Sequence, residues 1–403
     1  IESSGVRHVS AGVDHSLYIK NGSLFAMGDN QFGQLGDGTT DNNSTPQQIV
    51  SSGVTGVAAG AYHSLYVKND GSLWGMGDNT SGQLGDGSNI GRSTPVQIQP
   101  SGVIFVTAGH GFTLFQKDDD SLWGMGKSGP MGSVSGATPA QIATNTFPSA
   151  IGAGAGHSLY VTGSQLFTSG DGSLGQLGNG SNSNEASFTD VTAPPTLLYC
   201  WAGDYHSLFV LTGNGGELYA TGKNNEGQLG NNTNVDQNSY VSVATGVQTY
   251  PESVSAGEAH TLFIKTDGSL WAMGRNNSGQ LGDGTTSSLS TPTQILSSAE
   301  MNPKTLTLSV SGGIGGTVSG SGTYDYNASV NAVASPASGF IFESWSGALS
   351  GENKNTTFNI TSSSTISATF YQEAAIQNVQ ANPGTYGLYT EADKNASYDS
   401  GGT

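Results

Sequence analysis

The chain of 403 residues contains 61 glycines, with only 10% charged and 34% hydrophobic residues. This composition is unlike that of a helical enzyme rich in Ala, Leu, Glu and Lys, and it favours strands and loops. With 12 Lys and Arg against 30 Asp and Glu, the formal net charge is −18. A polyanion such as DNA would be repelled by this charge, so we expect no nucleic-acid partner.

The sequence also limits where the protein works. No run approaches the ~20 apolar residues of a membrane-spanning helix, and residues 1–10 lack the basic and apolar regions of a signal peptide. Because the sequence opens on Ile1 rather than Met, we expect a leader or a longer upstream region. A single cysteine, Cys200, excludes an internal disulfide framework. Low Lys with abundant Asn, Ser, Thr and Gly favours a secreted or surface protein of a bacterium.

From residue 2 to residue 298, one unit of about 48 residues recurs six times. An equivalent glycine marks each copy, at Gly12, Gly60, Gly109, Gly154, Gly203 and Gly257. Within the copy at 51–98, two short β-type segments at 63–67 and 72–76 flank Asn69-Asp70-Gly71, which is a tight-turn signal. Segments 53–59 and 94–98 supply two further strands. Four strands per unit, repeated around a ring, predict a β-propeller.

The order of motifs within the unit is specific. AGxxHSLYxK is followed by DGSLWxMGxNxxGQLGDG and then by TPxQI. This order resembles the repeat of the regulator of chromosome condensation (RCC1) family, whose fold is a propeller that usually has seven blades. We therefore expect an all-β, RCC1-like β-propeller over residues 1–298, in which six repeats are visible and seven blades are possible.

The string GQLGDG at Gly33–Gly38 recurs in similar form in four other copies. A phosphate-binding loop needs Lys-Ser or Lys-Thr after its last glycine and a strand-to-helix context, and both are absent. The glycines instead predict a corner between strands that needs positive φ. The leucines of this motif are expected to fill the space between blades; they are Leu35, Leu84, Leu177, Leu229 and Leu281.

Other repeated positions point to structure rather than chemistry. Five units share a histidine, at His15, His63, His157, His206 and His260. These histidines are spread around a ring, whereas a metal needs three or four converging ligands, so we expect them to satisfy local backbone groups. Asp37, Asp41 and 118–120 are candidates for Ca²⁺, but their spacing matches no Ca²⁺ loop and favours solvated corners. We expect no metal, no cofactor and no enzymatic activity.

Departures from the repeat are the candidate binding residues. The third unit has Phe112 in place of the histidine and replaces GQLG with a segment that contains Pro130 and Met131. Trp201 stands where the other units have a small or short residue. It is either an anchor for a partner beside the central channel or a filler of space between small side chains. The predicted binding site therefore consists of Phe112, Pro130, Met131, Trp201 and Tyr205.

Residues 306–370 alternate apolar and polar residues through five or six short strands. The segments SVSGGIGGTVSGSGTY, GFIFESWSG and TISATF resemble the divergent InlB B-repeat domain, a small bacterial surface module. We expect this β domain at 304–371, with Phe340, Phe342 and Trp345 as core anchors. Residues 372–403 are expected to be a linker or a truncated tail.

Together these features predict a noncatalytic extracellular or cell-surface bacterial protein that uses its propeller for binding, adhesion or structural assembly. The expected partner is a protein or a surface glycan, or a second copy through self-association. An alternative is a secreted protein inhibitor of an enzyme, because a bacterial inhibitor of β-lactamases resembles this propeller. Guanine-nucleotide exchange, which the family name implies, is the least favoured function because of the acidic charge.

Overall fold

The computed structural model describes residues 5–144, 148–191, 197–212, 215–297, 304–324 and 328–372. The chain divides into two compact units, Ile1–Asn302 and Pro303–Thr403, and each is described by itself. The expected linker or truncated tail lies outside the described residues from residue 373 onward.

The first unit consists of six sheets, each of four consecutive antiparallel strands, which we call blades 1 to 6. Blades 1 and 2 comprise β1 (Val6–Ala11), β2 (His15–Lys20), β3 (Ser23–Gly28), β4 (Asn43–Val50), β5 (Val54–Ala59), β6 (His63–Lys68), β7 (Leu73–Gly77) and β8 (Arg92–Gln99). Blades 3 and 4 comprise β9 (Val103–Ala108), β10 (Phe112–Lys117), β11 (Leu122–Gly126), β12 (Gly136–Ala143), β13 (Pro148–Ala153), β14 (His157–Thr162), β15 (Gln165–Gly170) and β16 (Glu185–Val191). Blades 5 and 6 comprise β17 (Leu197–Ala202), β18 (His206–Leu211), β19 (Glu217–Gly222), β20 (Gln237–Thr245), β21 (Val254–Ala256), β22 (His260–Ile264), β23 (Leu270–Gly274) and β24 (Leu289–Leu296), with the 3-10 turn η2 (Pro251–Ser253) before β21.

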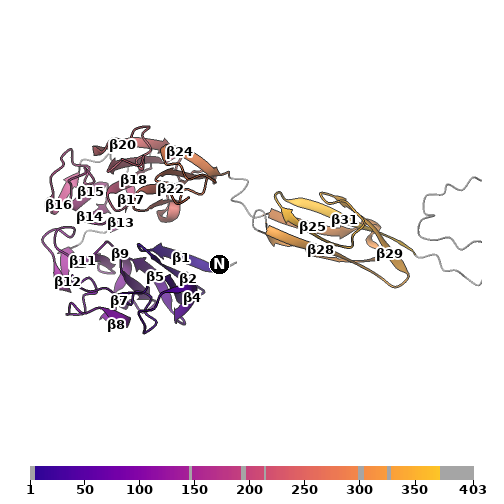
Figure 1. The fold of residues 1–403 in the computed structure, drawn as a ribbon, viewed down its shortest axis with the longest axis horizontal. Coiled ribbons are helices and arrows are strands. Elements are labelled where there is room, and N and C mark those ends of the chain that lie inside the picture. The colour runs from indigo at the N-terminus through magenta and orange to yellow at the C-terminus, as the bar shows by residue number, and fades with distance from the viewer. Residues whose placement is uncertain are drawn as a thin grey trace, which may run out of the picture. The chain divides into compact units, whose positions relative to one another are not determined.

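The first strand of each blade is its innermost strand. β1 packs beside β5, β5 beside β9, β9 beside β13, β13 beside β17, and β17 beside β21. These strands form the inner wall of the unit, and the fourth strands lie at its periphery (Figure 1). The predicted all-β propeller is confirmed.

Each blade is built around the hairpin of its second and third strands. In blade 2 the turn is closed by Gly71, whose φ of +75° is easy only for glycine, and by Asp70 Oδ1, which accepts a hydrogen bond of 2.9 Å from Ser72 N. Beyond the turn, Tyr66 and Trp74 stand opposite each other with ring centroids 6.2 Å apart. Stacked cross-strand aromatic pairs recur in the other five blades, at Tyr18–Phe25, Phe115–Trp123, Tyr160–Phe167, Phe209–Tyr219 and Phe263–Trp271. The aligned aromatic residues therefore pack within blades.

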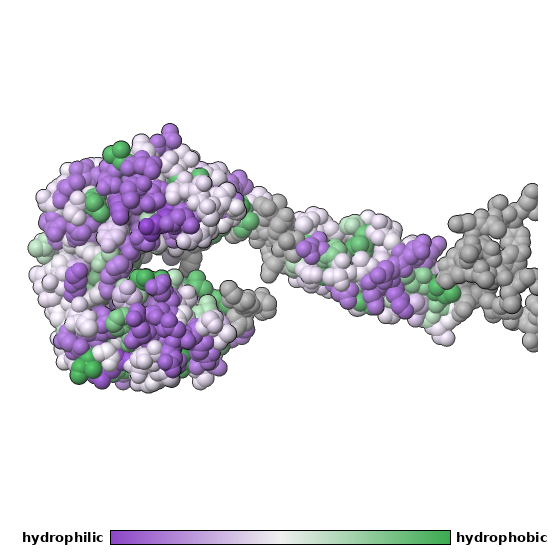
Figure 2. Space-filling view, viewed as in Figure 1, coloured by the Kyte–Doolittle hydropathy of each residue, from purple (hydrophilic) through white to green (hydrophobic). Residues whose placement is uncertain are grey.

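The row of blades is open between blade 6 and blade 1. At five inner glycines the carbonyl oxygen of the equivalent glycine in the next blade lies 2.3 to 2.6 Å from where a Cβ would stand, at Gly12, Gly60, Gly109, Gly154 and Gly203. At Gly257, the last of the series, the three nearest atoms all belong to His260. At the other end, β1 is largely exposed and Val9 retains 76% of its accessible surface. Figure 2 shows the opening between the first and sixth sheets.

The second unit holds two sheets that enclose one core. Its strands are β25 (Lys304–Val310), β26 (Gly316–Ser319), β27 (Gly322–Tyr324), β28 (Ala328–Pro336), β29 (Phe340–Gly347), β30 (Asn355–Ile360) and β31 (Ser364–Gln372), with the 3-10 turn η3 (Ser311–Gly313). One sheet has the order β27-β25-β31-β29 and the other β26-β28-β30, and only the β25–β31 pair among them is parallel. Trp345 is buried and Phe342 packs against the same core, as expected, whereas Phe340 is half-exposed at the start of β29.

Candidate functional site

A chain of two hydrogen bonds joins neighbouring blades at four of the five seams. At the seam between blades 2 and 3, Thr113 Oγ1 donates to the carbonyl oxygen of Gln83 at 2.9 Å and lies 3.1 Å from His63 Nε2. Because the hydroxyl proton is used on the carbonyl, the hydroxyl oxygen accepts from the Nε2–H of the histidine. The same histidine–hydroxyl contact joins His15 to Ser64, His157 to Ser207, and His206 to Thr261. The histidines thus bind side chains of the next blade, where the sequence favoured local backbone groups.

This environment fixes the charge of the seam histidines. The Nδ1 atoms of His15, His63, His157 and His206 are buried without a hydrogen-bond partner. Desolvation by burial lowers the pKa of His63 and His206 to about 3, and that of His15 and His157 to about 4. All four side chains are therefore neutral at pH 7. Among the described residues, no group of three or more His, Cys, Asp or Glu side chains is arranged to hold a metal ion.

The GQLGDG motif forms the other half of the seam. In the second repeat, Asn79 Oδ1 accepts a hydrogen bond of 2.9 Å from Leu84 N, and Asn79 Nδ2 donates to Asp86 Oδ1 at 3.0 Å. Gly82 has a φ of +83°, and a Cβ there would stand 2.6 Å from the Cα of Ala137 in blade 3. All five motif leucines are buried. The motif is therefore an inter-blade corner, as predicted. The Asn79 and Asp86 side chains bind each other within the loop, and the Gln83 carbonyl accepts a hydrogen bond from Thr113 of blade 3.

Three of the predicted binding residues lie in the core. Phe112 and Met131 have no accessible surface and belong to one hydrophobic cluster at the seam of blades 3 and 4. Pro130 is also buried, and its carbonyl oxygen accepts a hydrogen bond from Ser158 Oγ, in the place that the Gln83 carbonyl takes at the preceding seam. The third unit therefore rebuilds the seam with other residues, and these side chains have no free surface to offer a partner.

The other two predicted residues reach the surface of blade 5. Trp201 on β17 is half-buried, packs against the core of blades 5 and 6, and donates from Nε1 to the carbonyl of Pro251 at 3.0 Å. Tyr205, in the loop after β17, is half-buried and its ring centroid lies 5.0 Å from Lys223 Nζ. Cys200 beside Trp201 is buried, and desolvation raises the pKa of its thiol to about 12, so it stays protonated.

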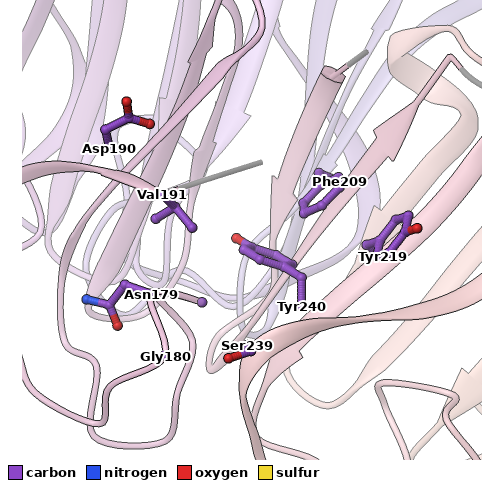
Figure 3. Close-up of a pocket in the computed structure, with 9 residues that line it drawn as sticks. Asn179, Gly180, Asp190, Val191, Phe209, Tyr219, Ser239 and Tyr240 are labelled. Carbon is purple, nitrogen blue, oxygen red and sulfur yellow. The ribbon is translucent and has the colours of Figure 1, made fainter. Parts of the chain in front are cut away.

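A pocket of about 440 Å³ lies between blades 4 and 5 and was not predicted from the sequence. Tyr240 of β20 occupies the position that proline takes in four other repeats, and its ring centroid is 4.4 Å from that of Phe209. Its hydroxyl points toward the strand that carries Val191 (Figure 3) and is buried without a hydrogen-bond partner. Burial raises the pKa of Tyr240 well above its usual value, so the hydroxyl stays protonated.

Sequence comparison with protein families agrees with this geometry. The profile of the regulator of chromosome condensation (RCC1) repeat matches residues 21–67, 70–116, 215–264 and 267–317, and a second RCC1 repeat profile matches 6–34, 54–83 and 252–280. The chain belongs to the RCC1 repeat family. The divergent InlB B-repeat domain matches residues 306–374.

Among curated RCC1 repeat proteins, the human X-linked retinitis pigmentosa GTPase regulator is 34% identical over 155 residues, which are 38% of this chain and 15% of the relative. The human regulator of chromosome condensation is 35% identical over 120 residues, 29% of this chain and 28% of the relative. The matches thus span less than a third of either relative.

Solved structures with the same fold include human WBSCR16, with a TM-score of 0.63, 19% identity and coverage of 73% of this chain and 82% of that one. Prp20p from Saccharomyces cerevisiae, which binds Gsp1p and histones, has a TM-score of 0.64, 18% identity and coverage of 74% and 78%. At this identity the likeness concerns the fold alone.

Proposed function

We propose that this chain is a noncatalytic binding scaffold of an extracellular or cell-surface bacterial protein. The supporting observation is the combination of RCC1 repeats with a divergent InlB B-repeat domain in one chain. The propeller supplies a rigid platform with variable loops, and the second unit carries it. No helix within the described ranges is both long and apolar enough to cross a bilayer.

The repeated polar groups form hydrogen bonds within the propeller, which also favours a binding role over catalysis. The seam histidines are neutral, buried and engaged with the next blade. A general acid or base needs a pKa near the working pH and access to a substrate, and these side chains have neither. Recognition then falls to exposed residues on the loops and on the inner strands, and Trp201 and Tyr205 remain the proposed contacts from the initial set.

Chemical cross-linking of the full chain on intact bacterial cells, followed by identification of the captured molecule, tests this proposal. We expect one captured surface protein or glycan, with capture weakened by Trp201→Ala. Trp201→Phe keeps an aromatic ring of smaller area and loses the Nε1 hydrogen bond, so it is the control that retains aromatic contact. A Trp201→Ala chain that melts earlier but still captures its partner would limit Trp201 to a filling role.

Other functions predict other outcomes in the same preparation. A stoichiometric loss of β-lactamase activity would identify an inhibitor, and light scattering that shows large assemblies would identify a structural subunit. Acceleration of nucleotide release from a small GTPase would contradict the proposal and favour exchange.

A further inference from the structure

Two aromatic side chains from neighbouring blades meet on the face that carries the GQLG loops. Phe32 precedes Gly33 in the loop of blade 1, and Tyr62 precedes His63 at the start of β6 in blade 2. Their ring centroids are 5.1 Å apart, and Phe32 retains 39% of its accessible surface. Three other repeats have Ser81, Glu226 and Ser278 at the position of Phe32. Packing of the blades against one another therefore does not require an aromatic residue at this position.

Blade 5 shows what the tyrosine at this position binds. Tyr205 is the counterpart of Tyr62, and Lys223 is the counterpart of Asp78. Lys223 N donates to the carbonyl of Tyr205 at 2.9 Å, and its ammonium group lies 5.0 Å from the ring centroid, which is a cation–π contact. Asp78 N donates to the carbonyl of Tyr62 in the same way, at 2.8 Å. The backbone is thus repeated at Tyr62, but an acid stands where blade 5 has its own cation.

Acidic residues lie on the segments next to Tyr62: Val13 N donates to the Ala61 carbonyl, which brings Asp14 close, and Asp78 N donates to the carbonyl of Tyr62 itself. Asp29 N donates to the carbonyl of Asp14, which places these two residues together, and Asp14 is exposed. The carboxylates of Asp29 and Asp78 accept hydrogen bonds of 2.7 Å from the neutral side chains of Gln34 and Gln83. The ion pairs observed among the described residues involve other acids, namely Asp86, Asp204 and Glu258.

We propose that the patch of Phe32, Tyr62, Asp14, Asp29 and Asp78 binds a Lys or Arg side chain of a partner protein, with its cation over the Tyr62 ring. The carboxylates supply the charge complementarity, and the ring replaces part of the hydration of the cation. This inference rests on the proposed binding function, and it adds a second contact surface on blades 1 and 2 and the chemistry of the group bound there.

The test uses the full chain and a tetra-lysine peptide as the probe, with tetra-arginine as a second probe, and measures affinity by calorimetry at low and at physiological salt. Asp78→Lys copies blade 5 by placing a cation beside Tyr62, and we expect about tenfold weaker binding. Lys223→Asp makes the opposite change and should add a second site at Tyr205. Glu352→Lys, in the second unit, changes the net charge as Asp78→Lys does and is the control.

Two milder variants keep the test valid if Asp78→Lys unfolds the loop. Asp78→Asn removes the charge and keeps one acceptor oxygen for Gln83, with the loss of the second acceptor, which binds Thr80 N, so binding should weaken several-fold. Tyr62→Leu keeps an apolar side chain and removes the ring face. Unchanged affinity of Tyr62→Leu, together with a loss in Asp78→Asn no greater than the loss in Glu352→Lys, would overturn the inference, because binding would then follow net charge alone.

The experiments distinguish a failure of the proposed cation site from a failure of the proposed scaffold function. Capture of a cell-surface partner that depends on Trp201 but is unchanged in Asp78→Asn and Tyr62→Leu would leave the scaffold function standing and overturn the cation site. Site-dependent binding of the peptide, in a chain that captures no surface partner, would support the cation site and contradict the location of the scaffold.

Discussion

The Nε2 atom of His63 lies 3.1 Å from Thr113 Oγ1 across the seam between blades 2 and 3. The two residues are 50 positions apart in the sequence, and both are fully buried. Because the hydroxyl also binds the Gln83 carbonyl, one small group satisfies a side chain and a backbone atom of the preceding blade. Buried polar groups that lose such partners are costly, so this contact makes the stability of the propeller sensitive to pH and to single substitutions.

The first prediction concerns pH. The folded-state pKa of His63 is lowered from 6.5 to about 3, so between these values the unfolded chain binds more protons than the folded one. Stability therefore falls as pH falls below 6.5, by up to ~1.4 kcal/mol per pH unit for each seam histidine. Urea unfolding of the propeller at pH 7, 6 and 5 measures this slope.

A His63→Phe variant, which copies the natural Phe112 of blade 3, is the control for that slope. It should lose less stability between pH 7 and pH 5 than the wild type, because one titrating group is gone. The aspartates with lowered pKa act in a different window, below their usual value of 3.8. Equal slopes in the two proteins would show that the seam histidines do not control the acid response.

The second prediction separates backbone strain from inter-blade contact. Gly82→Ala and Gly279→Ala place an alanine at φ values of +83° and +76°, which costs each ~1–2 kcal/mol. At Gly82 the new Cβ also stands 2.6 Å from the backbone of Ala137, whereas at Gly279 the nearest atom is 3.9 Å away. Gly82→Ala should therefore be the more destabilising by ~2 kcal/mol or more in chemical denaturation. Similar losses would mean that the corner relaxes without cost to the seam.

The third prediction compares a seam hydroxyl with its counterpart at the open end. Ser64 Oγ lies 2.9 Å from His15 Nε2 and donates to the Gln34 carbonyl at 2.7 Å. Ser64→Ala leaves both groups buried without a partner and should cost ~1–3 kcal/mol. Ser16→Ala, at the equivalent position of blade 1, should change the free energy of unfolding by less than ~0.5 kcal/mol. Calorimetric melting of the two variants gives the comparison.

The fourth prediction concerns the pocket between blades 4 and 5. The Tyr240 hydroxyl is buried without a hydrogen-bond partner, so Tyr240→Phe removes a desolvated polar group and keeps the ring against Phe209. We expect the variant to be as stable as the wild type or more stable by ~1 kcal/mol. Tyr219→Phe, which removes a hydroxyl bonded to Glu217 at 3.1 Å, is the control. A clear loss of stability in Tyr240→Phe would reveal a partner for this hydroxyl.

Much of the fold can be predicted from the sequence because the same turn and strand signals recur in each repeat. The turn at Asp70 and Gly71 and the facing aromatics Tyr66 and Trp74 are local features, and local features are readable from spacing. Spacing does not predict whether a residue that departs from the repeat is buried. Phe112 differs in chemistry from the histidines it aligns with, yet it fills the same seam, so a rare residue there indicated repacking and not recognition.

The candidate site was harder to predict because its contacts cross blades. Phe32 and Tyr62 belong to different repeats, and alignment of the repeats places them in separate columns. The signal that was present is the exchange of Lys223 for Asp78 beside an equivalent tyrosine. That exchange acquires meaning only when the structure shows the ammonium group of Lys223 over the ring of Tyr205.

The seam between blades has a direction. One side always contributes the histidine or Phe112 and the corner loop, and the other contributes the hydroxyl group and the strand against which the corner rests. The row of six blades therefore ends in two unlike edges, with His260 and the loop of Gly279 at one edge and the face of Ser16 at the other. Such edges match head to tail and not head to head. Duplication or deletion of a whole repeat therefore keeps the same kind of contact at every seam, whereas inversion of one blade disrupts both seams that this blade makes.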